Sequence, residues 1–343
     1  MLGISVYFQD YDEDYLRKCA EIGAKYVFTS LHIPEEDYSD LDIKLPAFLS
    51  LCQELDLTIC PDVSPVTFEK LHLTFGDFET LKQLGFKALR LDYGFDDVAH
   101  IQSLIQNFEI FLNASVVSET FIKDLNEAKV DFNRITFTHN FYPKRFTGLS
   151  LDTFKEKQAI FKKYHLRTQA FVCGDVLKRF PLYEGLPTLE IHRDTHPLVA
   201  SLELISLGVT DIMIGDSKAS DATLKAIQTF MSENILELKV HLDYKYAMYY
   251  DQIFECRKDQ SDISLRLNTP RTKGNAPYQN GKRRKGDITL DNDLMGRYSG
   301  ELQLLKQDLP SDARVNCIGF IHPQYIDALD FIHTDTKIKL VKF

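Results

Sequence analysis

The sequence lacks the paired cysteines that organise many secreted and zinc-binding proteins. Its six cysteines are scattered along 343 residues and include no Cys-x-x-Cys pair. Most of them lie within apolar stretches, where a thiol behaves as a small buried side chain. A disulfide framework and a zinc site are therefore not expected, and this cysteine usage fits a reducing compartment.

Basic charge and long apolar runs are also scarce. The net charge is −10, which argues against the basic surface that general nucleic-acid binding requires. The first residues, Met1–Phe8, have the pattern of a strand, without the basic start and apolar core of a signal peptide. No apolar run is long enough to span a membrane. We therefore expect a cytoplasmic protein that binds neither nucleic acid nor membranes.

Several enzyme signatures are missing as well. No glycine-rich phosphate turn follows the first predicted strand, which argues against an open dinucleotide-binding sheet. No lysine stands near the C-terminal end of the first seven predicted strands, which disfavours a Schiff-base aldolase. The first strand has no His-x-His, which disfavours a metal-dependent amidohydrolase. His139, His192 and His196 are too dispersed for a zinc set, and we expect no cofactor, although a site for a harder ion stays open.

Through residue 234, the sequence alternates between strand and helix patterns. Eight β-prone apolar segments are each followed by a segment with apolar residues at helical spacing. The predicted strands are Leu2–Phe8, Ala24–His32, Leu57–Asp62, Ala88–Tyr93, Glu109–Ser115, Arg134–Asn140, Arg167–Gly174 and Asp211–Asp216. The predicted helices are Asp12–Gly23, Pro46–Leu55, Thr67–Leu84, Asp96–Phe108, Ser118–Lys129, Leu151–Tyr164, Pro197–Leu207 and Ser220–Met231. Eight such units predict an α/β fold, a (β/α)₈ TIM barrel over residues 1–234.

The pattern changes after Asn234. Short alternating segments replace the strand-helix units, and one helix is predicted at Tyr244–Arg257. The predicted strands are Glu237–Asp243, Ile263–Leu267, Asp287–Leu290, Glu301–Leu305, Arg314–Phe320 and Lys337–Val341. Their spacing predicts a small C-terminal β-barrel domain over residues 235–343. Within it, the basic stretch Arg271–Gly286 has the composition of a mobile, solvated loop.

The fourth predicted strand carries the most informative stretch, Lys87–Gly94. Because side chains alternate along a strand, Arg90 and Asp92 share one face. One interpretation is a structural ion pair that braces the sheet. The other places Asp92 at the mouth of the barrel, where Arg90 keeps its carboxylate ionised for catalysis. The seven other predicted strands repeat this pattern of an apolar strand that ends in a charge and a turn, and the repetition favours the second interpretation.

Catalytic residues of a (β/α)₈ barrel lie at the C-terminal ends of the strands and in the loops that follow. Carboxylates are frequent at these positions, which indicates carboxylate chemistry, with glycoside hydrolysis as its type case. An ionised Asp92 suits a nucleophile or a stabiliser of positive charge, so the proton donor must be another carboxyl group. Glu35 is the first choice for this acid, with Asp62 and Asp175 behind it.

Polar residues at the same strand ends are candidates for binding a substrate. The candidates for contacts with sugar hydroxyls are Asn113, His139, Asn140 and Tyr142. Barrels often bind phosphate through the loops after the seventh and eighth strands, where Arg193 with Ser217 or Lys218 forms the predicted anion site. The remaining candidates for substrate contacts are Arg90, Arg145, Glu190 and Asp216.

Short motifs in both parts of the chain occur together in one known family. In the first part these are Thr29–Glu35, Leu89–Gly94, Leu112–Ser115, His139–Pro143 and Gly185–Glu190. In the second part they are Gly286–Asn292 and Arg297–Gln303. As a set, these motifs resemble the 6-phospho-N-acetylmuramidase family over nearly the whole chain.

The resemblance implies a TIM barrel followed by a cyclophilin-like C-terminal domain. It also implies a phosphorylated disaccharide as substrate. The reaction would be hydrolysis of the β-1,4 bond of N-acetylmuramic acid 6-phosphate–N-acetylglucosamine, during cytoplasmic recycling of peptidoglycan fragments. Two stretches near the predicted anion site depart from the family. Cys173–Asp175 stands where the family tends to have Pro-Gly-Asp, and Arg179–Pro181 stands where it often has Arg-Gly-Pro.

The residues themselves leave two other functional classes open. A sugar-phosphate isomerase or epimerase would hold a divalent ion with Asp, Glu and His side chains, and chelation would stop its activity. A ligand-binding or regulatory protein would turn over no substrate and would use its second domain to contact a partner. The second domain could also mediate self-association into a homo-oligomer.

Overall fold

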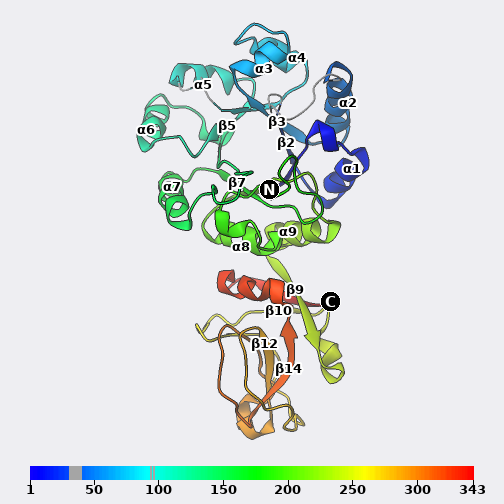
Figure 1. The fold of residues 1–343 in the computed structure, drawn as a ribbon. Coiled ribbons are helices and arrows are strands. Elements are labelled where there is room, and N and C mark those ends of the chain that lie inside the picture. The colour runs from blue at the N-terminus through cyan, green and yellow to red at the C-terminus, as the bar shows by residue number, and fades with distance from the viewer. Residues whose placement is uncertain (31–40, 93–94, 96) are drawn as a thin grey trace. The chain divides into compact units, whose positions relative to one another are not determined.

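The chain forms two compact units, which span Met1–Gln228 and Thr229–Phe343 (Figure 1). The computed structural model describes residues 1–30, 41–92, 95 and 97–343. Each unit buries its own set of hydrophobic side chains. Within the described part of the chain, no helix has the length and apolar character needed to cross a bilayer.

The first unit is a closed barrel of eight parallel strands. The strands are β1 (Leu2–Ser5), β2 (Tyr26–Ser30), β3 (Thr58–Val63), β4 (Ala88–Leu91), β5 (Glu109–Asn113), β6 (Ile135–Thr138), β7 (Thr168–Val172) and β8 (Asp211–Ile214). Each strand pairs with the next one along the chain, and β1 closes the ring against β8. The predicted (β/α)₈ barrel is therefore confirmed.

Helices surround the strands of the barrel (Figure 1). They are α1 (Glu13–Ile22), α2 (Leu41–Glu54), α3 (Pro65–Lys70), α4 (Phe78–Gln83), α5 (Val98–Leu104), α6 (Glu119–Glu127), α7 (Leu151–Lys163), α8 (Pro197–Ser206) and α9 (Asp221–Glu233). Local signals set their ends, as at α6, where the Ser118 hydroxyl accepts a hydrogen bond from the N–H of Phe121. The third predicted helix, Thr67–Leu84, is divided into α3 and α4, with Gly76 at φ +87° in the turn between them.

Alternation along the strands decides which side chains point toward the inside of the barrel. Phe28, Phe111, Phe171 and Ala88 belong to one buried cluster in its interior. Because Ala88 of β4 points inward, Arg90 points the same way. The N–H of Asp92 continues the strand ladder by donating to the carbonyl of Val63. The packing of the core thus aims the polar end of β4 at the mouth of the barrel.

The second unit is a mixed sheet of seven strands. They are β9 (Ile235–Leu242), β10 (Ile253–Glu255), β11 (Ser264–Arg266), β12 (Asp287–Asp291), β13 (Leu302–Leu305), β14 (Val315–Ile321) and β15 (Lys337–Lys342), in the order β10-β15-β9-β14-β12-β13-β11. Only β9 and β15 pair in parallel. The two end strands also meet, because Cys256 pairs with Leu267 and the N–H of Asn268 donates to the carbonyl of Glu255. The sheet therefore curls into the small β-barrel that the sequence predicted.

The helix predicted at Tyr244–Arg257 is wrong. Only Tyr244–Tyr249 form a short 3-10 helix, and Ile253–Glu255 form β10, which pairs with β15. The chain turns at Asp251, which has a left-handed backbone with φ +60° and donates its N–H to the carbonyl of Leu340. Tertiary pairing with β15 thus outweighs the local helical pattern.

The basic stretch Arg271–Gly286 is hydrogen-bonded to the sheet. The buried side chain of Asn316 donates to the carbonyl of Ala276 and accepts from the backbone N–H of Tyr278. The Asn280 side chain donates to the carbonyl of Val315. These contacts anchor a segment whose composition alone predicts a mobile loop.

Two buried carboxylates lie next to each other, one at the end of β12 and one directly before β13. The N–H of Asp291 donates to the carbonyl of Glu301, and both residues are almost fully buried. Arg271 donates to the Glu301 carboxylate at 2.5 Å, whereas one carboxylate oxygen of Asp291 has no hydrogen-bond partner. Burial and, second to it, repulsion from Glu301 raise the pKa of Asp291 to about 6.

Candidate active site

A buried arginine organises the C-terminal ends of β3, β4 and β6. Arg90 is 3% exposed. Its Nη1 donates to a carboxylate oxygen of Asp62 at 2.5 Å, and its Nη2 donates to the side-chain oxygen of Asn140 at 2.5 Å. A buried guanidinium needs such partners to satisfy its charge and its donors. We call Asp62, Arg90 and Asn140 the Arg90 cluster.

Asp92 is the more accessible carboxylate beside this cluster. Its side chain is 30% exposed, compared with 11% for Asp62. One of its oxygens lies 3.7 Å from Nη1 of Arg90, and Nδ2 of Asn113 donates to the same oxygen at 3.5 Å. Asp92 is therefore oriented by protein groups on one side and open to a ligand on the other.

The carboxylates of Asp62 and Asp92 are close enough to act on one bond. Both contact the same Nη1 of Arg90, at 2.5 and 3.7 Å, so the contacting oxygens are no more than about 6 Å apart. One guanidinium between two carboxylates leaves a net negative charge. Such a site favours a transition state that develops positive charge.

The first candidate for the proton donor, Glu35, lies outside the described residues. The loop after Asp92 is also described only in part, because residues 93, 94 and 96 fall outside the same set. The described centre of the candidate site is therefore the Arg90 cluster with Asp92 and Asn113.

Asp175, another candidate acid, lies in the loop after β7, and its carboxylate binds the start of helix α9. Its carboxylate accepts hydrogen bonds from the backbone N–H and the hydroxyl of Ser220 and from the hydroxyl of Thr223. Burial raises the pKa of Asp175, but the bonds from Thr223 and Ser220 outweigh it and hold the pKa below its usual value. A carboxylate bound in this way caps a helix and is a poor proton donor.

The residues of the predicted anion site contact carboxylates of the protein itself. The Ser217 hydroxyl donates to Asp10 at 2.6 Å, and Lys218 donates to Asp12 at 2.6 Å. Asp216 is fully buried and accepts the backbone N–H groups of two residues in the loop after β7, Gly174 and Arg179. These contacts join the loops that follow β1, β7 and β8.

Buried Arg193 and half-buried Glu190 form a second network, which we call the rim clamp. Arg193 donates twice to the Glu190 carboxylate at 2.7 Å and also binds the backbone carbonyls of Gly185 and Tyr142. The Glu190 carboxylate accepts two backbone N–H groups of the loop after β6. Hydrogen bonding from Arg193 lowers the pKa of Glu190 to about 2. The clamp therefore ties the loop after β6 (139–150) to the loop after β7 (173–196).

Three further candidates lie away from the Arg90 cluster or contribute their backbone. His139 packs against Phe154 and binds Gln158 of α7, so it faces the helix layer. Burial lowers the pKa of His139 to about 4. The side chain of Arg145 pairs with both carboxylate oxygens of Asp194. Tyr142 contributes backbone hydrogen bonds to the rim clamp, through its carbonyl, and to Pro187, through its N–H.

Two aromatic residues of the rim loops were not among the candidates chosen from the sequence. Phe146 follows β6 and Tyr183 follows β7, and both side chains are exposed. Each stands two positions before a glycine, Gly148 or Gly185. An aromatic residue followed by such a turn signal, in a loop at the catalytic end of a barrel, is the pattern that could have identified them.

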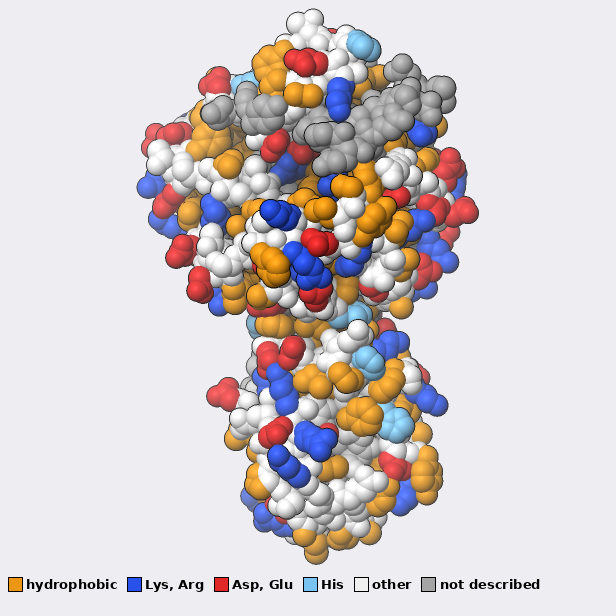
Figure 2. All heavy atoms as spheres, viewed as in Figure 1, with side chains coloured by type: hydrophobic (Ala, Val, Ile, Leu, Met, Phe, Trp, Pro, Cys, Tyr) orange, Lys and Arg blue, Asp and Glu red, His pale blue; other side chains and the backbone are white. Residues whose placement is uncertain are grey.

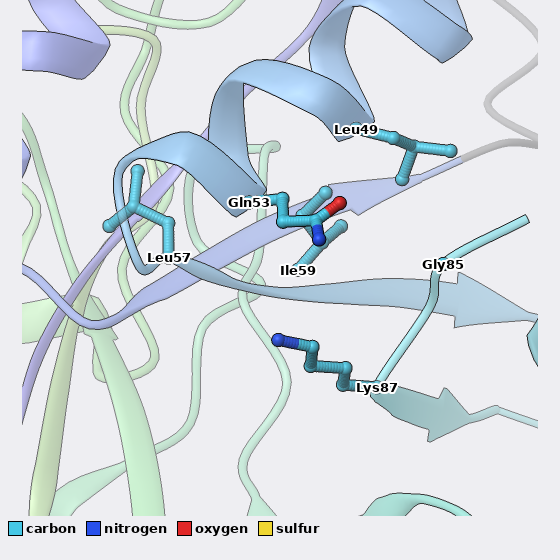
Figure 3. Close-up of a pocket in the computed structure, with 6 residues that line it drawn as sticks. All are labelled: Leu49, Gln53, Leu57, Ile59, Gly85 and Lys87. Carbon is cyan, nitrogen blue, oxygen red and sulfur yellow. The ribbon is translucent and has the colours of Figure 1, made fainter.

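A small pocket of about 90 Å³ lies near the N-terminal ends of β3 and β4 (Figure 3). It is lined by Leu49, Gln53, Leu57, Ile59, Gly85 and Lys87. Gly85 and Lys87 precede β4, at the end of the barrel opposite to Asp92. Because catalytic residues of this fold lie at the C-terminal ends of the strands, this pocket is not part of the candidate active site.

Comparisons with known proteins identify related sequences and structures. A family model described as "6-phospho-N-acetylmuramidase, N-terminal" matches residues 2–229, and its C-terminal counterpart matches residues 236–341. A search of curated proteins found no match. A solved structure from Enterococcus faecalis, a conserved protein with an unknown function, is 30% identical over 100% of this chain and 96% of its own, with a TM-score of 0.84. An uncharacterized B. cereus protein shares the fold at 24% identity over 99% of each chain, with a TM-score of 0.78.

Proposed function

Because the chain belongs to the 6-phospho-N-acetylmuramidase family, we propose that it hydrolyses the β-1,4 bond of N-acetylmuramic acid 6-phosphate–N-acetylglucosamine. The reaction would take place in the cytoplasm as a step of peptidoglycan recycling. The observation that carries this proposal is the Arg90 cluster with Asp92 beside it, at the end of a (β/α)₈ barrel where catalysis takes place.

Asp92 is the proposed catalytic carboxylate. It is accessible, and Arg90 and Asn113 orient it from the side of the protein. An ionised carboxylate in this place stabilises or attacks the positively charged anomeric carbon as the glycosidic bond breaks. Because the substrate carries an N-acetyl group, Asp92 is also placed to orient that acetamide in a substrate-assisted route.

Glu35 is the proposed proton donor for the leaving oxygen. Asp62 is less suitable because its carboxylate already accepts a hydrogen bond from the Arg90 guanidinium. Asp175 is engaged at the start of α9. Asn113 and Asn140 remain the proposed contacts for sugar hydroxyls, while Arg193, Ser217 and Lys218 are not assigned to the phosphate because each already binds protein groups.

Substitution of Asp92 by asparagine tests the proposal. We expect Asp92→Asn to fold normally and to lose roughly 10³-fold or more in kcat, because the charge that the transition state needs is removed. The measurement is release of N-acetylglucosamine from the disaccharide, with circular dichroism to confirm folding. Asp97→Asn is the matched control. It makes the same substitution five residues further along the chain, at the N-cap of α5, where asparagine caps a helix as well as aspartate does.

The outcomes separate this proposal from its alternatives. Near-normal turnover by Asp92→Asn would refute the catalytic assignment, and no turnover by the wild-type protein would favour a binding protein. A metal-dependent isomerase or epimerase would lose activity on chelation, whereas the proposed hydrolase retains it. Within the described residues, no three acidic, histidine or cysteine side chains lie together as a metal site requires.

A further inference from the structure

Two exposed aromatic side chains stand in neighbouring loops at the catalytic end of the barrel. Phe146, in the loop after β6, is 87% exposed, and Tyr183, in the loop after β7, is 56% exposed. Isolated exposed hydrophobic side chains are common on protein surfaces and need no explanation by themselves. The backbone conformation of these two residues, however, does require an explanation.

Both residues have a left-handed backbone, with φ +66° at Phe146 and φ +55° at Tyr183. Such a conformation is unfavourable for a bulky side chain. The other described non-glycine residues with positive φ are polar, and most of them follow helices, as Lys129 follows α6 and His165 follows α7. Positive φ is ordinary at the end of a helix. Tyr183 ends a single turn, in which its N–H donates to the carbonyl of Arg179. Phe146 follows no helix, so other contacts must impose its conformation.

The rim clamp imposes the conformation of Phe146. The Glu190 carboxylate accepts the N–H of Phe146 and that of Gly148, both at 2.8 Å. A Cβ atom on Gly148 would lie 2.7 Å from a Glu190 carboxylate oxygen, so the turn fits only glycine. The buried Arg193 holds Glu190 in place.

The loop that carries Tyr183 is tied to the same clamp. The Glu184 carboxylate accepts the backbone N–H of Arg145, so the residues next to Tyr183 and Phe146 are hydrogen-bonded to each other. Arg193 also donates to the carbonyl of Gly185. Charge-assisted hydrogen bonds to Glu190 and Glu184 therefore hold the two loops that carry these aromatic residues together at the rim.

We propose that Phe146 and Tyr183 form a sugar-binding subsite at the rim of the barrel, which takes the pyranose ring of the leaving N-acetylglucosamine. This inference rests on the proposed function and extends it. A pyranose ring has an apolar face of C–H groups that packs on an aromatic ring, while its hydroxyls remain in water. The substrate has two rings, and Asp92, the proposed catalytic carboxylate at the end of β4, acts at the bond between them.

The arginine beside Phe146 is already paired with protein carboxylates, which favours the unphosphorylated sugar at this place. Arg145 next to Phe146 is paired with Asp194 through two hydrogen bonds, and its Nε lies 3.9 Å from the Glu184 carboxylate next to Tyr183. This rim arginine is therefore balanced by two carboxylates. An uncharged N-acetylglucosamine needs no cation for binding at this place. A phosphate does need one, and Arg145 is already paired with Asp194 and Glu184.

Two variants test the subsite, Phe146→Asn and Tyr183→Asn, because asparagine tolerates a left-handed backbone and removes the aromatic ring. For each variant we expect KM for the disaccharide to rise about fivefold, with kcat within about twofold of wild type, because the lost contact is made equally in ground and transition states. Inhibition by the product N-acetylglucosamine should weaken in parallel. The melting temperature should not fall, because the change relieves strain at positive φ.

Tyr244→Asn is the matched control. Tyr244 is an equally exposed aromatic residue, 81% accessible, in the second unit, and lies outside the rim loops. Its substitution should leave KM, kcat and product inhibition unchanged. An unchanged KM in both rim variants would overturn the subsite. A change that appears only with substrates carrying a stem peptide would also overturn it, because the peptide would then be the occupant.

A binding measurement separates failure of the subsite from failure of the proposed function. Ligand-observed NMR with N-acetylglucosamine alone requires no turnover. The wild-type protein should give saturation transfer to the ring protons of the sugar, and the double variant Phe146→Asn/Tyr183→Asn should lose it. Saturation transfer that persists in the double variant contradicts the subsite, even when the hydrolase is active.

Discussion

Arg90 carries a full positive charge in a place that is almost closed to water. Asp62 and Asn140 bind its two terminal nitrogens, and Asp92 lies near one of them. A buried ion pair adds little net stability, but breaking it is costly because one charge is left without a partner. The main effect of Arg90 is therefore positional, because it fixes the distance between two carboxylates that come from different strands.

Arg90→Lys tests this positional role. A lysine keeps the charge but cannot hold two partners with a planar fork of donors. We expect kcat to fall at least roughly 100-fold and the free energy of unfolding to fall by about 1–3 kcal/mol. Steady-state kinetics and thermal denaturation measure the two effects. Arg314→Lys, at an arginine that pairs with Asp312 in the second unit, should change neither quantity measurably.

The sequence predicted part of this arrangement and missed part of it. Alternation along β4 correctly indicated that Arg90 and Asp92 point to one side of the strand. The closer partner, Asp62, is brought to Arg90 by the register between β3 and β4, which a single sequence does not specify. His139 shows the same limit, because its place at a strand end was clear while its orientation toward α7 followed only from packing.

At the scale of elements, the start of α9 depends on a carboxylate from another part of the chain. Asp175 lies in the loop after β7 and binds Ser220 and Thr223 at this helix end. A negative charge is stabilising at a helix N-terminus, where backbone N–H groups are unpaired. Asp175 thus joins the loop after β7 to the last helix of the barrel.

Asp175→Ala distinguishes a capping role from a catalytic one. Loss of the cap should lower the free energy of unfolding by about 1 kcal/mol and leave kcat within about twofold of wild type. Denaturant titration and the disaccharide assay provide the two readouts. Asp152→Ala, in the exposed first turn of α7, is the control. A large loss of kcat with unchanged stability would return Asp175 to the role of proton donor.

The elements that the sequence predicted correctly are those with a strong and regular pattern. All eight barrel strands lie where apolar β-prone segments indicated, because a strand buried on both faces needs an apolar run. Strand β10 was missed because it is three residues long and is defined by its pairing with β15. The rim clamp was not predicted either, since the hydrogen bonds that connect its two loops join positions more than forty residues apart.

At the scale of the whole molecule, the two units respond to acid in opposite ways. Burial lowers the pKa of His139 in the barrel to about 4, so the unfolded chain binds a proton before the folded barrel does. The barrel therefore loses stability as pH falls below about 6.5. Burial raises the pKa of Asp291 in the second unit to about 6, so the folded unit binds a proton first and gains stability as pH falls.

Calorimetry at several pH values tests this opposition. Between pH 6.5 and 5, each group should change the stability of its unit by on the order of 1–2 kcal/mol, in opposite directions. The unfolding transition of the barrel should move to lower temperature relative to that of the second unit. Asp291→Asn should remove the pH response of the second unit and leave that of the barrel unchanged. Transitions whose separation is independent of pH would contradict both assignments.

The closed sheet of the second unit also affects how the protein behaves at high concentration. An open edge strand presents a row of unpaired N–H and C=O groups, to which a strand of another molecule can add. In residues 229–343, all of which are described, the bonds between Cys256 and Leu267 and between Asn268 and Glu255 occupy the place where such an edge would be. Another chain therefore has no ready starting point for strand addition, which protects this unit from fibril-like aggregation.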